Sequence, residues 1–292
     1  MLNNYKTYRL YLFFVLFFSA NISAATHPST WPFDSGETLH YKLSYQGLLT
    51  SFLWADLADV QLSFRDHIKL FDTAVDNEQN GLQFIVNVST ENYLKAELIQ
   101  PVRYSYIATT NTFLKKTLLV ENIDQGYDKR HEFLWLDWKN KSTQLFEIVE
   151  SETHDTVLEN IAEFFIQFPP AQSQKQNLLY KKSGDSITPV SVLDPLSLIY
   201  YLRTQDDIQE NEIFIAISDD IRKYKIEHMD KEILRLNGQA IVSNKYKIQT
   251  DEKKNKFYYV WLADDKKKIP LRFAMDAPLG HLNIDLLKYK LD

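Results

Sequence analysis

Apolar and polar residues alternate with a period of two along most of the chain, a pattern typical of β-strands. In residues 39–45, leucine and tyrosine at odd positions alternate with His40, Lys42 and Ser44. From residue 52 to 64, apolar residues occupy the even positions, and only Asp56 interrupts this face. A strand of this length with one polar interruption predicts a bend or bulge near Asp56.

The same alternation predicts further strands at residues 82–88, 103–107, 115–120, 130–138, 145–149, 224–236, 239–248, 257–262, 269–275 and 281–291. Asn237-Gly238 is a strong hairpin signal, and Asn80-Gly81 also predicts a turn. Both faces of 130–138 are apolar, which predicts a central strand. Consecutive strands with tight turns favour a mainly β fold: a curved antiparallel sheet or open β-barrel with one or two helices packed on or in it.

Two segments carry helix signals. Thr156 and Glu159 form a capping-box pattern before an apolar segment that ends at Pro169-Pro170. In the second segment, Asp194 is a suitable N-cap, Pro195 a suitable first helical residue, and the amide of Ser197 is placed to receive the cap. The polar stretch 172–186 between them predicts a loop.

The N-terminus has the pattern of an export signal. Lys6 and Arg9 precede the apolar run Leu10 to Phe18, and small residues follow as far as Ala25. The alternatives are a buried strand or a retained anchor. We expect a cleaved signal peptide at 1–25 and one β-rich domain at 26–292 in the periplasm. No later segment has the roughly 20 apolar residues of a spanning helix, so we expect no stable transmembrane anchor.

Composition and charge narrow the choice of partner. Aromatic residues make up 14% of the chain, which suits strands, and the formal net charge is −6. An acidic balance argues against nucleic acid, whose phosphates attract Lys and Arg clusters. The chain has no cysteine, which excludes disulfides, thiolate metal sites, cysteine nucleophiles and a lipid-modified cysteine.

No catalytic motif stands out. The 7 glycines are scattered, no G-x-S-x-G is present, and the 7 histidines lack metal-ligand spacing. Three acidic doublets, which begin at Asp206, Asp219 and Asp264, lie in turn-like contexts that favour solvated loops. We therefore expect no enzyme activity, metal or cofactor.

Arg203 is unusual because it falls within the apolar stripe of a helix that is apolar nearly all round. A buried guanidinium requires a partner, since an unpaired charge there is very costly. Asp56, which interrupts an apolar strand face, is a candidate for a buried ion pair that fastens the helix to the sheet. The alternatives are a cationic contact for an anionic headgroup or carboxylate of a ligand, and snorkelling to solvent.

Three segments together resemble the domain of unknown function 3108 family of bacterial envelope proteins. They are Trp31 to Tyr41, the helix from Asp194 through Tyr201 to Arg203, and Trp261 to Arg272 with Leu279-Gly280. The resemblance extends over nearly the whole mature chain. It implies a periplasmic β-rich domain, supplies no catalytic residues, and suggests an architecture similar to the curved sheet of lipoprotein-sorting proteins that hold lipid chains.

These observations favour a non-enzymatic cell-envelope protein that binds an amphiphilic or lipid-like ligand, or an envelope protein partner. A carbohydrate-binding or carbohydrate-active protein is the first alternative, because sugars stack on exposed tryptophan and tyrosine. A purely structural scaffold or adaptor is the second. An accessible apolar cavity would support the ligand hypothesis. Two carboxylates that face each other across a groove would support the carbohydrate hypothesis. A large exposed apolar patch without a pocket would support the scaffold hypothesis.

Overall fold

The computed structural model describes residues 31–48, 54–70, 80–126, 129–148, 178–206, 208, 211–217, 220–251, 256–277 and 279–287. Within these ranges, a 15-stranded antiparallel sheet accounts for most of the chain. Its strands are β1 Thr38–Gly47, β2 Trp54–Lys69, β3 Asn80–Ser89, β4 Arg103–Asn111, β5 Thr117–Asp124, β6 Arg130–Asp137, β7 Ser142–Ile148, β8 Leu178–Ser186, β9 Asn211–Ile217, β10 Asp220–His228, β11 Glu232–Leu236, β12 Gln239–Asp251, β13 Lys256–Ala263, β14 Pro270–Ala277 and β15 Gly280–Leu286. The predicted signal peptide and the predicted helix after Thr156 lie outside the described residues.

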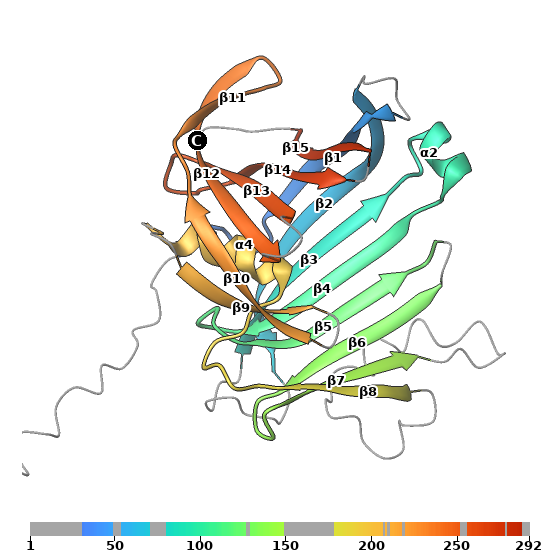
Figure 1. Ribbon diagram of the computed structural model, residues 1–292, viewed down its shortest axis with the longest axis vertical. Helices are drawn as coiled ribbons and strands as arrows, with labels where there is room; N and C mark the ends of the chain where they lie inside the picture. Colours follow the sequence, from blue (N-terminus) through green and yellow to red (C-terminus); the bar gives the residue numbers. More distant parts are fainter. Residues whose placement is uncertain are drawn as a thin grey trace, which may run out of the picture. The chain divides into compact units, whose positions relative to one another are not determined.

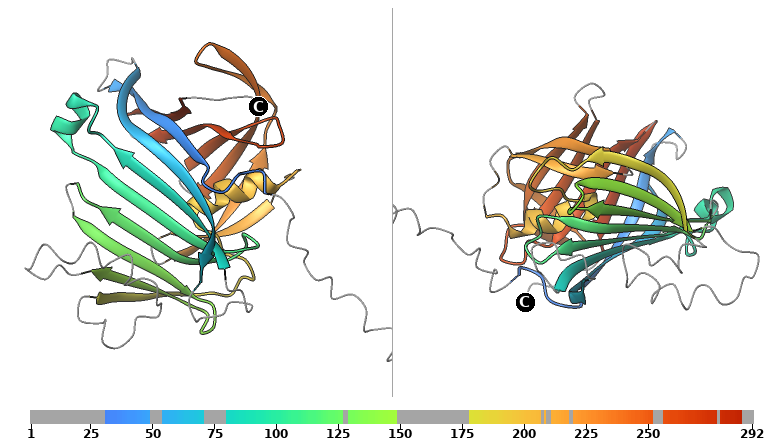
Figure 2. Two further views of the ribbon diagram at one scale, coloured as in Figure 1. Left: turned by 180° about the vertical axis from the view of Figure 1, so that it is seen from behind. Right: turned by 90° about the horizontal axis from the view of Figure 1, so that it is seen from below.

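The sheet is a curved meander in which the first strand, β1, and the last strand, β15, lie side by side in the middle of the strand order. The order is β8-β7-β6-β5-β4-β3-β2-β1-β15-β14-β13-β12-β10-β9, and β11 pairs with β12 beside this path. β1 pairs with β15, where Tyr41 is opposite Leu286, so the first and last described strands are neighbours. Figures 1 and 2 show the strands curling around α4 (Pro195–Thr204). The predicted fold class is confirmed.

The short stretch before α4 links two distant strands. Val192 forms a parallel bridge with Lys116 next to β5, and Leu193 forms one with Ile215 of β9. The backbone amide of Thr117 donates to Val192 (2.8 Å), and that of Ala216 donates to Leu193 (2.7 Å). This stretch therefore carries the chain across the concave side of the sheet and fixes where α4 begins.

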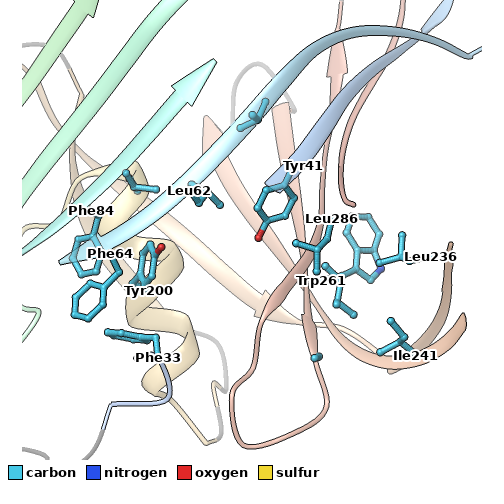
Figure 3. Packing of buried hydrophobic residues seen from close by; sticks show 14 of the residues in the cluster. Phe33, Tyr41, Leu62, Phe64, Phe84, Tyr200, Leu236, Ile241, Trp261 and Leu286 are labelled. Atoms are coloured by element: carbon cyan, nitrogen blue, oxygen red, sulfur yellow. The ribbon is translucent and has the colours of Figure 1, made fainter. Parts of the chain in front are cut away.

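Buried apolar side chains surround α4 on both sides. Tyr200 stacks on Phe84 with ring centroids 4.2 Å apart, and Phe33 and Phe64 meet the same ring (Figure 3). Leu198 and Leu202 pack instead into a second cluster, with side chains from β9, β10, β12 and β13. A helix that is apolar nearly all round is thus matched by a sheet that curves about it.

The bulge predicted near Asp56 is confirmed. Leu43 lies opposite Ala58, whereas the next residue, Ser44, lies opposite Asp56, so β2 holds one extra residue at Leu57. An extra residue reverses the alternation of faces beyond it. Asp56 therefore lies on the outer face of the sheet, as Ser44 does. Without the bulge, Asp56 would lie on the inner face with Ala58, which is two residues further along the strand.

Other local predictions were wrong. Asn80-Gly81 is part of β3 rather than a turn, and a Cβ on Gly81 would come within 2.6 Å of the Thr110 carbonyl oxygen, so this glycine permits close strand contact. The predicted loop 172–186 contains β8, an edge strand, where polar residues are tolerated because one side lacks a neighbour. The predicted strand 224–236 divides into β10 and β11, and β9 was missed.

Candidate functional site

An apolar cavity of about 430 Å3 lies between α4 and the concave side of the sheet. This volume is within the range of roughly 300–1,000 Å3 that small-molecule sites occupy. The described residues that line it are Leu43, Val60, Leu62, Val86, Tyr104, Tyr106, Pro195, Leu196, Leu198, Ile199, Ile215, Ile217, Tyr224, Ile248, Tyr258, Tyr259, Val260, Phe273, Ala274, Met275, Leu282 and Ile284.

The lining offers little polar chemistry. Its described side chains are aliphatic or aromatic, with tyrosine hydroxyls as the only polar groups. Tyr104 donates to the Asn122 Oδ1 (2.8 Å) and Tyr106 to the Asp194 Oδ1 (3.3 Å). Burial raises the pKa of Tyr104 to about 12 and that of Tyr106 well above its ordinary value, so both phenols stay protonated at neutral pH. The cavity therefore suits an apolar ligand.

α4 forms one end of the cavity. Ile199 lies in the lining and is only half-buried, whereas Leu198 and Leu202 on the same helix are buried. The opposite end lies near the beginning of β13. Tyr258 alternates on the same face as the buried Val260 and Leu262, yet it is 39% exposed. We infer from this exposure that the cavity opens at the strand ends near Tyr258, remote from α4.

Asp194 fixes the helix at the base of the cavity. Its Oδ1 accepts from the backbone amides of Leu196 (2.9 Å) and Ser197 (3.1 Å), as the cap pattern predicts. Its Oδ2 accepts from the hydroxyls of Thr117 (2.9 Å) and Ser197. With Tyr106 as a further donor, a fully buried side chain ties α4 to both β4 and β5. Pro195 takes the first helical position.

Arg203 lies at the far end of α4, away from the cavity lining. Its guanidinium is fully buried and forms two hydrogen bonds with Glu37, at 2.5 and 2.9 Å. The Lys267 carbonyl oxygen also accepts from it (3.1 Å), and the Phe33 and Tyr200 rings lie 4.9 and 5.3 Å from its central carbon. The arginine thus fastens the helix to the segment before β1 and to the β13–β14 turn.

The structure does not bring Asp56 to Arg203. Asp56 lies on the outer face, where it pairs with Lys42 (2.9 Å) and accepts from Ser44 (3.0 Å). The proposed partnership between Asp56 and Arg203 was therefore wrong, because the bulge at Leu57 turns Asp56 outward. Glu37, the actual partner, lies 166 residues from Arg203 in a turn-like stretch with no periodic pattern to single it out.

Tyr201, Asp206 and Asp264, which the sequence also marked as candidates, make local structural contacts. Tyr201 is half-buried, and its carbonyl accepts from the Thr204 hydroxyl (2.7 Å). Asp206 and Asp264 are exposed and pair with Lys268 and Lys231, respectively, consistent with solvated loops. Within the described ranges, no three His, Cys, Asp or Glu side chains gather to hold a metal ion. None of the helices in these ranges is both long and apolar enough to cross a membrane.

Four of the five tryptophans, all in the described part of the chain, have surroundings that do not suit a sugar-binding groove. Trp261 is buried and donates to Glu232 (2.8 Å), and Trp138 donates to the Thr117 carbonyl (2.7 Å). Trp31 stacks on Phe33. Trp54 is 46% exposed but lies on the outer face. No described residue that lines the cavity is acidic, so the cavity lacks the pair of carboxyl groups that a glycosidase requires.

The fold and the cavity together define a mainly β protein whose curved sheet encloses an apolar space beside a helix. Residues 171–287 match the model of a family described as protein of unknown function, DUF3108. The match confirms the resemblance inferred from the α4 and C-terminal segments, whereas Trp31 to Tyr41 lies outside the matched residues.

No curated protein matches the chain. A crystal structure of a beta-barrel-like protein of domain of unknown function DUF1849 from Brucella abortus is similar at 10% identity. The match covers 86% of this chain and 95% of the Brucella chain, with a TM-score of 0.41.

Proposed function

We propose that this protein binds the apolar chain of an amphiphile, such as a lipid or fatty acid, in the cavity beside α4, and that it does so without catalysing a reaction. The observation that carries the proposal is the cavity itself, which remains open within an otherwise well-packed interior. Because protein interiors are packed to a density with few voids, an apolar space of about 430 Å3 favours a ligand.

The character of the lining supports an apolar chain over a sugar. Carbohydrates need several hydrogen-bonding groups, and the hydroxyls of Tyr104 and Tyr106 are already engaged with protein acceptors. The mouth near Tyr258 would leave a polar headgroup in contact with solvent while the chain extends toward α4. We further propose that the protein acts in the periplasm, because residues 1–25 have the pattern of an export signal.

Filling the cavity tests this proposal. Ile199→Trp and Val86→Trp add bulk at two described positions of the lining, one on the helix and one on β3. We expect each to weaken binding of a dansyl-labelled fatty acid at least about tenfold, because the chain and the indole would compete for the same space. The measurement is a fluorescence titration of the purified mature chain.

Ile233→Trp is the matched control, since Ile233 is 68% exposed on β11, outside the cavity lining. It should bind the probe as the wild type does. Unchanged binding by both cavity variants, with their circular dichroism preserved, would contradict the proposal, as would a wild-type protein that does not bind the probe.

A further inference from the structure

Six large apolar side chains are exposed at the end of the sheet where the cavity opens. We call them the apolar rim: Leu48, Trp54, Leu94, Leu98, Ile99 and Leu279. Because β1 and β3 end where β2 and β15 begin, the loops that carry these residues lie at one end of the antiparallel sheet. Figures 1 and 2 show α2 (Leu94–Ile99) and the adjoining ends of β1 and β2 at the end remote from α4.

The short helix α2 supplies half of the apolar rim. Leu94, Leu98 and Ile99 are 72%, 77% and 86% exposed, and no residue of α2 is buried. Monomeric soluble proteins rarely gather exposed apolar side chains in this way, and such patches mark contacts with proteins or membranes. The helix therefore does not contribute to the core, and its apolar surface needs another explanation.

Polar contacts hold α2 in place from both sides. Arg103 pairs with Glu97 (2.8 Å) and Glu91 (2.7 Å), and the Thr90 hydroxyl donates to Glu97. Hydrogen bonds from Arg103 and Thr90 lower the pKa of Glu97. On the other side, Asp59 of β2 accepts from Tyr93 and Asn92, each at 2.6 Å. The exposed side chains therefore sit on a supported platform rather than on a frayed end.

The charges around α2 come from both signs and nearly cancel. Glu91 and Glu97 share Arg103 as their cationic partner, and Asp59 accepts hydrogen bonds from the neutral Tyr93 and Asn92. Lys95 is exposed and has no ion-pair partner among the described residues. A free cation among exposed leucines matches the arrangement of interfacial segments, in which apolar side chains enter the acyl region and lysine reaches the phosphates.

We propose that the apolar rim docks onto the surface of a phospholipid bilayer, with α2 and Trp54 in the interfacial region and Lys95 near the lipid phosphates. This inference rests on the proposed function, because it explains how an apolar chain reaches the mouth near Tyr258 without crossing water. The residues of the apolar rim come from three parts of the chain, namely α2, the adjoining ends of β1 and β2, and Leu279 before β15, and such a discontinuous surface fits a deformable lipid layer. Trp54 agrees with the preference of tryptophan for membrane interfaces.

The test is co-flotation of the mature chain with protein-free vesicles of phosphatidylethanolamine and phosphatidylglycerol. We expect the wild type to float with the vesicles. The triple substitution Leu94→Ser, Leu98→Ser and Ile99→Ser should reduce the bound fraction at least about tenfold, because it removes three apolar anchors. Lys95→Glu should weaken binding more at low salt than at high salt, since its effect is electrostatic.

Val190→Ser with Ile233→Ser is the matched control. These residues are 86% and 68% exposed but lie outside the apolar rim, so their replacement should leave flotation unchanged. A wild type that stays with the soluble fraction, or a triple variant that floats as the wild type does, would overturn the proposal. A requirement for membrane proteins in the vesicles would also overturn it, in favour of a protein partner.

The fatty-acid titration separates this inference from the proposed function. The rim triple variant should bind the soluble dansyl-labelled fatty acid normally, whereas Ile199→Trp should lose the probe and still float. Loss of flotation together with loss of probe binding in the rim variant would indicate a general defect in the sheet and would contradict the assignment of a separate docking surface.

Discussion

Replacement of Glu37 by alanine should lower the free energy of unfolding by about 3–5 kcal/mol, the usual cost of removing one partner of a buried ion pair. The Arg203 guanidinium would remain fully buried among the Phe33 and Tyr200 rings, with only backbone carbonyls as acceptors. Because this pair fastens the end of α4 to the segment before β1, the loss should appear in the whole cooperative transition. Urea unfolding followed by tryptophan fluorescence measures it.

A double substitution separates pairing from packing. Arg203→Met with Glu37→Met replaces both charges by apolar side chains, and we expect it to recover most of the stability lost in Glu37→Ala, because a buried pair and an apolar substitute differ little. Asp56→Ala is the control, since this exposed residue pairs with Lys42 on the outer face and should change stability by less than about 1 kcal/mol. Equal losses in Glu37→Ala and Asp56→Ala would contradict the assigned partnership.

Asp194→Ala should destabilise the protein by about 3 kcal/mol or more. Loss of the N-cap costs about 0.5–2 kcal/mol, and each buried hydroxyl left without an acceptor costs a further ~1–3 kcal/mol. Thr117 and Ser197 would lose their acceptor here, and Tyr106 would lose the contact that joins β4 to the helix. The same unfolding measurement applies.

Asp194→Asn refines this prediction. Asparagine can cap the helix, but its amide nitrogen cannot accept from Thr117 or Ser197, so we expect a loss smaller than that of alanine and larger than zero. Asp276→Ala is the matched control, because Asp276 is exposed and its side chain pairs with the exposed His281. If Asp194→Ala unfolds at the wild-type urea concentration, the anchoring role of Asp194 is wrong.

The sequence was most informative where a periodic pattern coincides with burial on one face. The alternation in β1, in β2 from Ala58 to Phe64 and in β13, the Asn237-Gly238 hairpin and the Asp194-Pro195 helix start are all local signals, and the structure confirms each of them. The bulge places Trp54 on the outer face, opposite to the predicted face. β9 carried a signal that was missed, a short continuous run of apolar residues at 213–217. β8 carried almost none, since an edge strand tolerates polar residues.

The site could not be predicted as well from the sequence, because it depends on how the strands are paired and on how much space the side chains leave between the sheet and α4. One extra residue in β2 decides that Asp56 faces outward, and the pairing of Glu37 with Arg203 joins positions 166 residues apart. The helical pattern marked Arg203 as unusual but could not identify its partner. The cavity arises from space that Ile199 and its neighbours leave unfilled, and no local pattern records an unfilled volume. The exposed leucines of α2 gave no helix signal because the helix is short.

Native mass spectrometry with lipid extraction, on protein purified without detergent from cells that express the full chain, tests the central claim most directly. We expect a stoichiometric amphiphile on the wild type and its absence, or strong depletion, on Ile199→Trp. A wild-type protein that carries no ligand and takes up none when mixed with phospholipid or fatty acid would contradict the account.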